Sequence, residues 1–186
     1  MTKKPCRPTR ADLEAAKSKT VPDLIAPNLK VLFVGINPGL YTAAIGHHFG
    51  RPGNRFWPAL YSGGFTPRLF DPSEKHELLK LGYGITNLVR RATARADELT
   101  DEELIAGVKV LRRKVRKYRP QFIAIVGITS YRTAFQQPKA KLGRQPDLFE
   151  GSVVWVLPNP SGLNRGFALD ALVRAYSELR SALAEM

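Results

Sequence analysis

Short apolar runs alternate along this chain with segments whose apolar residues recur every three or four positions. The runs are almost continuously apolar and are bounded by glycine, proline or polar residues, which predicts strands rather than helices. A continuous run, in place of strict alternation, is typical of a strand that is covered on both faces of its sheet. We predict such strands over residues 30–35, 83–89, 121–127 and 152–158.

Capping signals precede two of the segments with helical spacing. Thr100 is followed three residues later by Glu103, and Asp71 is followed at the same distance by Glu74, which is the capping-box pattern of a helix start. After Thr100, one face of the segment is apolar and the other is basic. We predict helices over residues 10–19, 54–64, 71–82, 100–118 and 168–183.

Strands that are separated by helices predict a parallel sheet with helices on both faces. We therefore expect an α/β fold, a single three-layer domain around a central, mainly parallel sheet of four to five strands. Residues 1–20 are basic and weakly periodic, which predicts a mobile N-terminal arm, and residues 21–186 then form the one domain. Because ligands bind beyond the carboxyl ends of such strands, functional residues are expected directly after each strand.

The net charge of the chain indicates which class of partner it binds. The chain has 29 Lys and Arg against 16 Asp and Glu, a formal net charge of +13. Such an excess is typical of proteins that bind a polyanion, most often nucleic acid, although a surface evolved for solubility gives the same count.

Composition also disfavours several other classes. The one cysteine, Cys6, permits neither an internal disulfide nor a cysteine metal cluster, which fits a reducing, cytoplasmic setting. Three histidines, two of them adjacent, make a poor metal site. The basic start has no apolar stretch behind it, so no signal peptide is predicted, and no apolar run has the length of a membrane helix. We expect a cytoplasmic protein, associated with the nucleoid if the source is bacterial.

The first strand ends in "GINPG", which places Asn37 on a turn fixed by Pro38 and Gly39. The motif lacks the pattern of a dinucleotide or phosphate loop. An asparagine at a strand end can orient a water molecule through its carbonyl oxygen or donate to a ligand. It can equally cap its own backbone in an Asx turn, and spacing alone does not separate the two interpretations.

Residues 41–57 are rich in glycine, which predicts a long loop. Long loops are often functional. Phe49 lies among these glycines, where it can either stack on a base or anchor the loop to the domain. His47 and His48 have no serine or cysteine nucleophile near them in sequence, so a hydrogen-bonding or surface role is expected.

The last strand runs into a polar turn over residues 157–166, in which Asn159 lies between two prolines. Leu163 is the large apolar residue of this turn. It either folds back into the core or enters a DNA base stack as a wedge, with Arg165 beside it to contact phosphate or base.

Three motifs together carry a family resemblance. "GINPG" at 35–39, "GNRFW" at 53–57 and "NPSGLNR" at 159–165 resemble the mismatch-specific uracil and thymine DNA glycosylases, the Mug/TDG branch of the uracil-DNA glycosylase superfamily. Each motif is short, but the order and spacing of the three are specific. The resemblance runs from about residue 25 to the C-terminus and implies the single α/β domain that the apolar pattern predicts.

The resemblance also implies roles for individual residues. Asn37 matches the catalytic asparagine that positions the attacking water, and Phe49 matches the aromatic residue that stacks on the flipped base. The base pocket is implied to contain Ile36, Pro38, Gly39, Thr42, His48, Phe49 and Asn159. The segment that contacts DNA and fills the gap in the stack is implied to contain Ser161, Gly162, Leu163, Asn164 and Arg165.

Two positions depart from the bacterial pattern. Arg90 stands where bacterial relatives commonly carry aspartate, and Asn87 where they carry lysine. Arg90 thus replaces an acid with a cation. Arg90 and Asn87 are therefore candidates for a second tier of active-site groups. The "GHHF" segment resembles the thymine-active eukaryotic members instead, which leaves the range of substrates open.

The resemblance therefore implies a monofunctional DNA glycosylase that starts base excision repair. It would flip and excise uracil, with thymine or modified pyrimidines as further candidates, from a G·U mismatch in double-stranded DNA. No cofactor and no metal are implied, and we expect a monomer.

Two other classes remain as alternatives. A non-catalytic, basic nucleic-acid-binding α/β domain would keep the charge and Phe49 without needing a pocket. An enzyme acting on free nucleosides would need the pocket but neither the charge nor the loop around Leu163.

Overall fold

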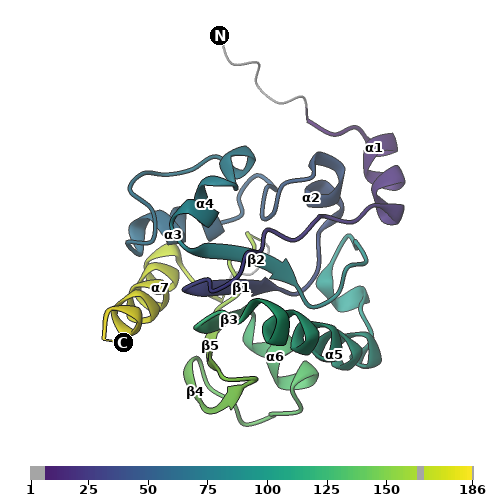
Figure 1. Ribbon diagram of the computed structural model, residues 1–186. Coiled ribbons are helices and arrows are strands. Elements are labelled where there is room, and N and C mark those ends of the chain that lie inside the picture. The colour runs from purple at the N-terminus through teal and green to yellow at the C-terminus, as the bar shows by residue number, and fades with distance from the viewer. Residues whose placement is uncertain (1–6, 163–165, 186) are drawn as a thin grey trace.

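A five-stranded sheet forms the centre of the computed structural model, which describes residues 7–162 and 166–185 (Figure 1). The strand order is β2-β1-β3-β5-β4. Neighbours among the first four strands of this order run parallel, whereas β4 is antiparallel to β5. The strands are β1 (Val31–Gly35), β2 (Tyr83–Asn87), β3 (Phe122–Val126), β4 (Gly143–Phe149) and β5 (Ser152–Leu157).

Both faces of the sheet are covered, which confirms the predicted three-layer α/β fold. Phe33 of β1 lies in one core with side chains of α3, α4 and α7, while its neighbour Leu32 lies in the other with side chains of α5 and α6. This alternation explains why the parallel strands are continuously apolar. The helices are α1 (Arg10–Ala15), η1 (Ala16–Ser18), α2 (Leu40–Ile45), α3 (Phe56–Ser62), η2 (Pro72–Glu74), α4 (Glu77–Lys80), η3 (Ala96–Glu98), α5 (Asp101–Tyr118), α6 (Ile128–Ala134) and α7 (Leu169–Ala184).

The predicted capping boxes form at both positions. The Thr100 hydroxyl accepts from the backbone N–H of Glu103, whose carboxylate accepts from the backbone N–H of Thr100, and α5 follows. Asp71 and Glu74 pair in the same way, but the segment after them divides into η2 and α4 instead of forming one helix over 71–82.

Pro58 is tolerated in α3, because it is the third helical residue and a helix leaves its first N–H groups unpaired anyway. The structure differs from the predictions in two further places, each for a physical reason. The glycine-rich loop after β1 is shorter than predicted, since residues 40–45 form α2. β4 escaped notice because it is a largely exposed edge strand that contains Pro146 and an irregular register.

The N-terminal segment contacts the domain through both α1 and η1, which lie against α2. Ala16 is fully buried and lies in a small apolar cluster with Val21, Ala43 and Ala92. A Thr9 cap opens α1, whose residues are all at least partly exposed. The predicted mobility of residues 1–20 stays a prediction.

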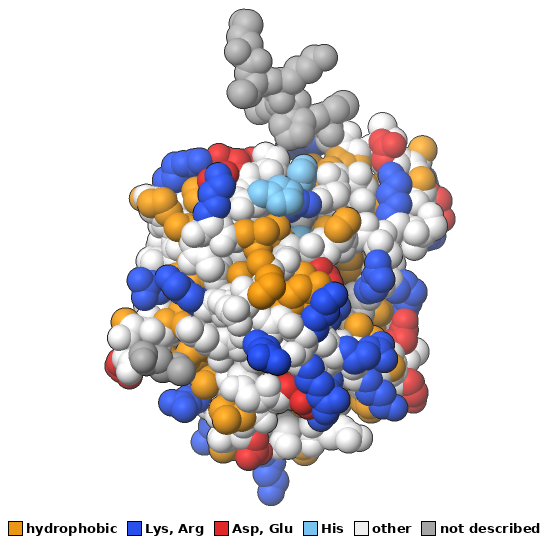
Figure 2. All heavy atoms as spheres, in the orientation of Figure 1, with side chains coloured by type: hydrophobic (Ala, Val, Ile, Leu, Met, Phe, Trp, Pro, Cys, Tyr) orange, Lys and Arg blue, Asp and Glu red, His pale blue; other side chains and the backbone are white. Residues whose placement is uncertain are grey.

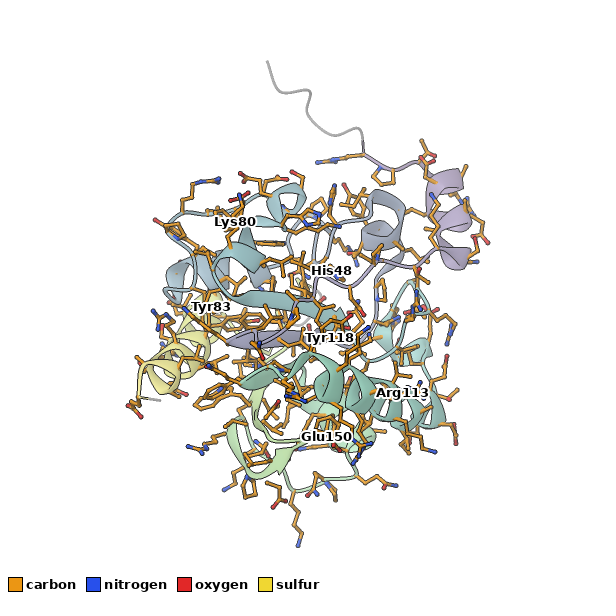
Figure 3. The ribbon with its side chains drawn as sticks, viewed as in Figure 1. His48, Lys80, Tyr83, Arg113, Tyr118 and Glu150 are labelled. Carbon is orange, nitrogen blue, oxygen red and sulfur yellow. The ribbon has the colours of Figure 1, made fainter. Side chains whose placement is uncertain are left out.

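Basic side chains are spread over the surface, and Figure 2 shows many of them on the face that carries α5. Arg113 lies on the outer side of this helix (Figure 3). The other exposed basic residues of α5 are Lys109, Arg112, Arg116 and Lys117. Among the described residues, no helix is both long and apolar enough to cross a membrane.

Candidate active site

A cavity of about 140 Å³ opens where the parallel strands end. Its wall combines the ends of β1, β2 and β3 with the turn that follows β5, so it lies at the edge where parallel sheets bind ligands. The lining residues are Ile36, Asn37, Pro38, Gly39, Thr42, His48, Phe49, Arg51, Asn54, Asn87, Thr93, Ala94, Arg95, Ala96, Val126, Asn159 and Ser161.

The side chain of Asn37 is held in one orientation. Its Nδ2 donates to the backbone carbonyl of Arg91 at 2.8 Å and to Thr93 Oγ1 at 2.7 Å. A carbonyl can only accept, so the nitrogen of the amide must face Arg91 and Oδ1 must face away from it. Both donated bonds go to a segment that follows β2, so this amide nitrogen is not engaged in its own turn.

The backbone of the same turn is fixed by the same segment. Thr93 donates its N–H to Pro38 O at 3.1 Å, and Leu40 donates to Thr93 O at 3.0 Å. No described residue accepts from the backbone N–H groups of Asn37 and Gly39. The turn is therefore rigid and leaves N–H donors for a bound ligand.

Phe49 lines the cavity, and its backbone conformation is unusual. Its φ is +54°, a left-handed conformation that bulky residues rarely adopt. The ring stacks on the fully buried Phe56, with centroids 3.9 Å apart and an angle of 17°. Gly35 makes room for this arrangement, because a Cβ there would lie 3.3 Å from Phe49 Cζ and would collide with Asn87 Oδ1.

His48 is 1% exposed and is one of the residues that line the cavity. Its Nε2 lies 2.9 Å from Pro22 O, which can only accept, so Nε2 carries the hydrogen. Burial lowers the pKa of His48 to about 4, against a smaller opposing effect of this hydrogen bond. The ring is consequently neutral at neutral pH, and Nδ1 is left as an acceptor.

Asn159 and Ser161 form an Asx turn beyond β5, in which Asn159 Oδ1 accepts from Ser161 N at 2.9 Å. Arg55 holds this turn from outside. Its Nη2 donates to Ser161 O at 2.8 Å, Nε donates to Pro160 O at 3.4 Å and Nη1 donates to Phe167 O. One guanidinium thus ties the two described ends of the 160–167 segment to the start of α3.

The structure brings most of the sequence-predicted residues together. All seven predicted pocket residues, the catalytic candidate Asn37, Asn87 and Ser161 line the cavity. Arg90 is exposed and is not part of the lining, and Gly162 is exposed beside Gly53. Leu163, Asn164 and Arg165 lie outside the described residues.

Sequence reasoning missed part of the wall. Arg51 is an exposed cation of the lining, and Asn54 lies just before α3, where its Oδ1 accepts from Phe56 N at 2.9 Å. Both lie in the glycine-rich loop that the sequence marks, so that loop was the available signal. Thr93 and the residues after it carry no local signal, since they reach the cavity only through their pairing with the Asn37 turn.

The polar groups of the lining limit its chemistry. Within the described lining there is no carboxylate and no lysine, and the titratable groups are His48, Arg51 and Arg95. Arg95 forms an ion pair with Asp97. The described wall therefore offers hydrogen-bond donors and acceptors and two cations in place of a strong general base. Nowhere among the described residues do three His, Cys, Asp or Glu side chains come close enough to hold a metal ion.

Comparison with known families gives one match over most of the chain. The family model described as "Uracil DNA glycosylase superfamily" matches residues 22–180. The matched region contains every described residue that lines the cavity.

Proposed function

Because the chain belongs to the uracil DNA glycosylase superfamily, we propose that it is a mismatch-specific enzyme of the Mug/TDG type. It flips uracil out of a G·U mismatch in double-stranded DNA, cleaves its N-glycosidic bond and so starts base excision repair. Thymine and modified pyrimidines are further candidate substrates. Unpairing costs least at a mismatch, which gives the enzyme part of its selectivity.

The observation that carries this proposal is the fixed amide of Asn37. Both Nδ2 hydrogens are used by Arg91 O and Thr93 Oγ1, so the carbonyl oxygen Oδ1 is the group that remains to accept from a water molecule. An amide is too weak a base to remove a proton early. It suffices to orient a water molecule towards a sugar carbon that has already become positive.

The order of charge development follows from the bond that breaks. As the bond from the sugar C1′ to uracil N1 opens, its electron pair leaves with the base, and C1′ becomes electron-poor. The oxygen of water then bonds to C1′ and loses a proton to solvent, and the uracil anion takes up one proton to leave as neutral uracil. Donors directed at the departing uracil anion stabilise this transition state most, and the backbone N–H groups of Asn37 and Gly39 are candidates.

Two further features support the proposal. Phe49 contributes an aromatic ring to the cavity lining, and stacking on a flipped base requires such a ring. The described lining contains no lysine to form a Schiff base, which favours a monofunctional glycosylase without lyase activity. The formal charge of +13 supplies attraction for the DNA backbone.

The test is release of free uracil under single-turnover conditions. The substrates are duplexes with one G·U or one A·U pair, the single strand containing uracil, and free deoxyuridine. We expect release from the G·U duplex, slower release from the A·U duplex and none from deoxyuridine. Asn37→Ala serves as the control for a contaminating glycosylase.

The other outcomes identify the alternative classes. Tight duplex binding without release from any substrate would indicate a non-catalytic binding domain. Release from deoxyuridine but not from duplex would indicate a nucleoside enzyme. Equal rates on G·U, A·U and single-stranded substrates would leave a uracil-DNA glycosylase and remove the mismatch specificity.

A further inference from the structure

Behind the cavity wall, three polar side chains form a closed network. Lys114 Nζ lies 2.7 Å from both Thr86 Oγ1 and Asp23 Oδ2, and Thr86 Oγ1 donates to Asp23 Oδ1 at 2.6 Å. Thr86 is fully buried, whereas the side chains of Lys114 and Asp23 are 16% and 29% exposed. None of the three lines the cavity.

The network joins three separate elements. Asp23 belongs to the segment before β1, Thr86 to β2 and Lys114 to α5. The segment around Asp23 is also tied to β2 through reciprocal backbone bonds between Leu24 and Ile85, of 2.8 and 2.7 Å. A valine would suit the buried position of Thr86 without any need for partners, so packing alone does not account for the hydroxyl.

The network borders directly on His48. Pro22, the residue before Asp23, accepts the hydrogen of His48 Nε2 through its carbonyl oxygen at 2.9 Å. That bond decides which ring nitrogen carries the hydrogen, because a neutral imidazole has one donor and one acceptor. Among the described residues, Nδ1 has no partner, and His48 is part of the cavity wall.

We propose that Asp23, Thr86 and Lys114 are positioning residues that hold the Pro22 carbonyl against His48, so that His48 presents Nδ1 to the cavity as an acceptor for an N–H of the bound base. The proposal rests on the proposed function. Uracil and thymine carry a hydrogen on N3, which such an acceptor can bind, whereas N3 of cytosine carries none. His48 is then a specificity-determining residue, and the network acts on the base only through it.

Thr86→Val tests the network with a change of almost no volume. The matched control is Thr66→Val, because Thr66 is also buried and donates to a backbone carbonyl, Arg68 O at 2.8 Å, but does not line the cavity. The first measurement is the ¹⁵N chemical shifts of the His48 ring in the free protein. We expect hydrogen on Nε2 in wild type and in Thr66→Val, and a mixture of the two tautomers in Thr86→Val.

The second measurement is single-turnover uracil release from the G·U duplex in a double-mutant cycle. We expect Thr86→Val to lower the rate by about tenfold, as for the loss of one well-placed hydrogen bond, and Thr66→Val to leave it within about twofold. In a His48→Phe background, Thr86→Val should cause no further loss, since its effect passes through the histidine. Melting temperatures of all variants separate a general loss of stability from this coupling.

Two results overturn the proposal. One is an unchanged His48 spectrum in Thr86→Val, and the other is a rate loss that persists in the His48→Phe background. The spectrum needs no activity and uses Thr86→Val alone, so it remains decisive if His48→Phe does not fold. Failure of wild type to release uracil would instead contradict the proposed function, and the spectrum would still report whether the network controls His48.

Discussion

The amide nitrogen of Asn37 and the hydroxyl oxygen of Thr93 lie 2.7 Å apart, although 56 positions separate the two residues in the chain. The bond joins the turn after β1 to the segment after β2. With the second bond to Arg91 O, it fixes which end of the amide faces the cavity. The orientation of the proposed catalytic group therefore depends on a residue outside every sequence motif.

Asn37→Ala removes the group that orients the water. We expect single-turnover uracil release from the G·U duplex to fall by about 10²-fold or more, as for the loss of one positioned catalytic group. Binding of the duplex should stay near wild type, because the amide is used in the cavity and not on the surrounding surface. Gel-shift titration measures the binding, and the single-turnover assay measures the rate. A wild-type rate in Asn37→Ala would show that Asn37 only shapes the turn.

Thr93→Val tests the orientation of that amide. The valine keeps the buried volume and removes the acceptor of one Nδ2 hydrogen, so Asn37 can rotate. We expect a loss of about tenfold in the single-turnover rate, comparable to one hydrogen bond. Thr93→Ser restores the hydroxyl and should recover most of the rate. A serine variant as slow as the valine variant would show that the methyl group, not the bond, matters.

Arg55→Gln tests how the turn after β5 is held. The change removes the guanidinium donors of Ser161 O and Phe167 O, while Pro160 O keeps the backbone N–H of residue 55. We expect the free energy of unfolding to fall by about 2 kcal/mol and uracil release to become slower. Arg55→Lys should rescue little, because an ammonium lacks the planar fork that reaches several carbonyls. Chemical denaturation and single-turnover assays provide the two measurements.

Arg180→Gln is the control for Arg55. Arg180 Nε also donates to a carbonyl, Gly64 O at 3.2 Å, but this bond is exposed and lies away from the cavity. We expect its unfolding free energy to change by no more than about 0.5 kcal/mol and its activity to remain. Equal effects of the two substitutions would contradict a special role for Arg55.

Burial of His48 predicts a dependence of stability on pH. Its pKa is lowered from 6.5 to about 4 in the folded protein, mainly by burial, so between these values the unfolded chain binds more protons. The contribution is fully present above pH 6.5 and is lost as the pH falls towards 4. The free energy of unfolding that is lost by pH 4 is on the order of 3 kcal/mol.

His48→Gln should flatten this part of the stability profile, measured by urea denaturation at a series of pH values. The control is the exposed His76→Gln, which keeps the buried His48 and should therefore keep its part of the slope. Burial also lowers the pKa of His47, which adds a slope of the same sign. A profile of His48→Gln as steep as that of wild type would contradict the burial of a neutral His48.

Several elements could be predicted from strong local signals in the sequence. The continuous apolar runs predicted β1, β2, β3 and β5, and the Thr100–Glu103 pair predicted the start of α5. Burial on both faces of a sheet and helix capping each depend on residues that are close together in the chain. The sequence alone therefore shows both patterns. The motif around Asn37 also marked the strand end at which the cavity lies, as expected for a parallel sheet.

The way in which those motif residues are held follows from the fold and not from local sequence. Thr93, Arg55 and the Asp23–Lys114 pair act on the cavity wall through contacts between segments far apart in the chain. No local pattern specifies them, because a hydrogen bond depends on where the fold brings two backbones together. The sequence identified Asn37 as a candidate residue. The orientation of its amide is set by the carbonyl of Arg91 and the hydroxyl of Thr93, which the fold brings beside it.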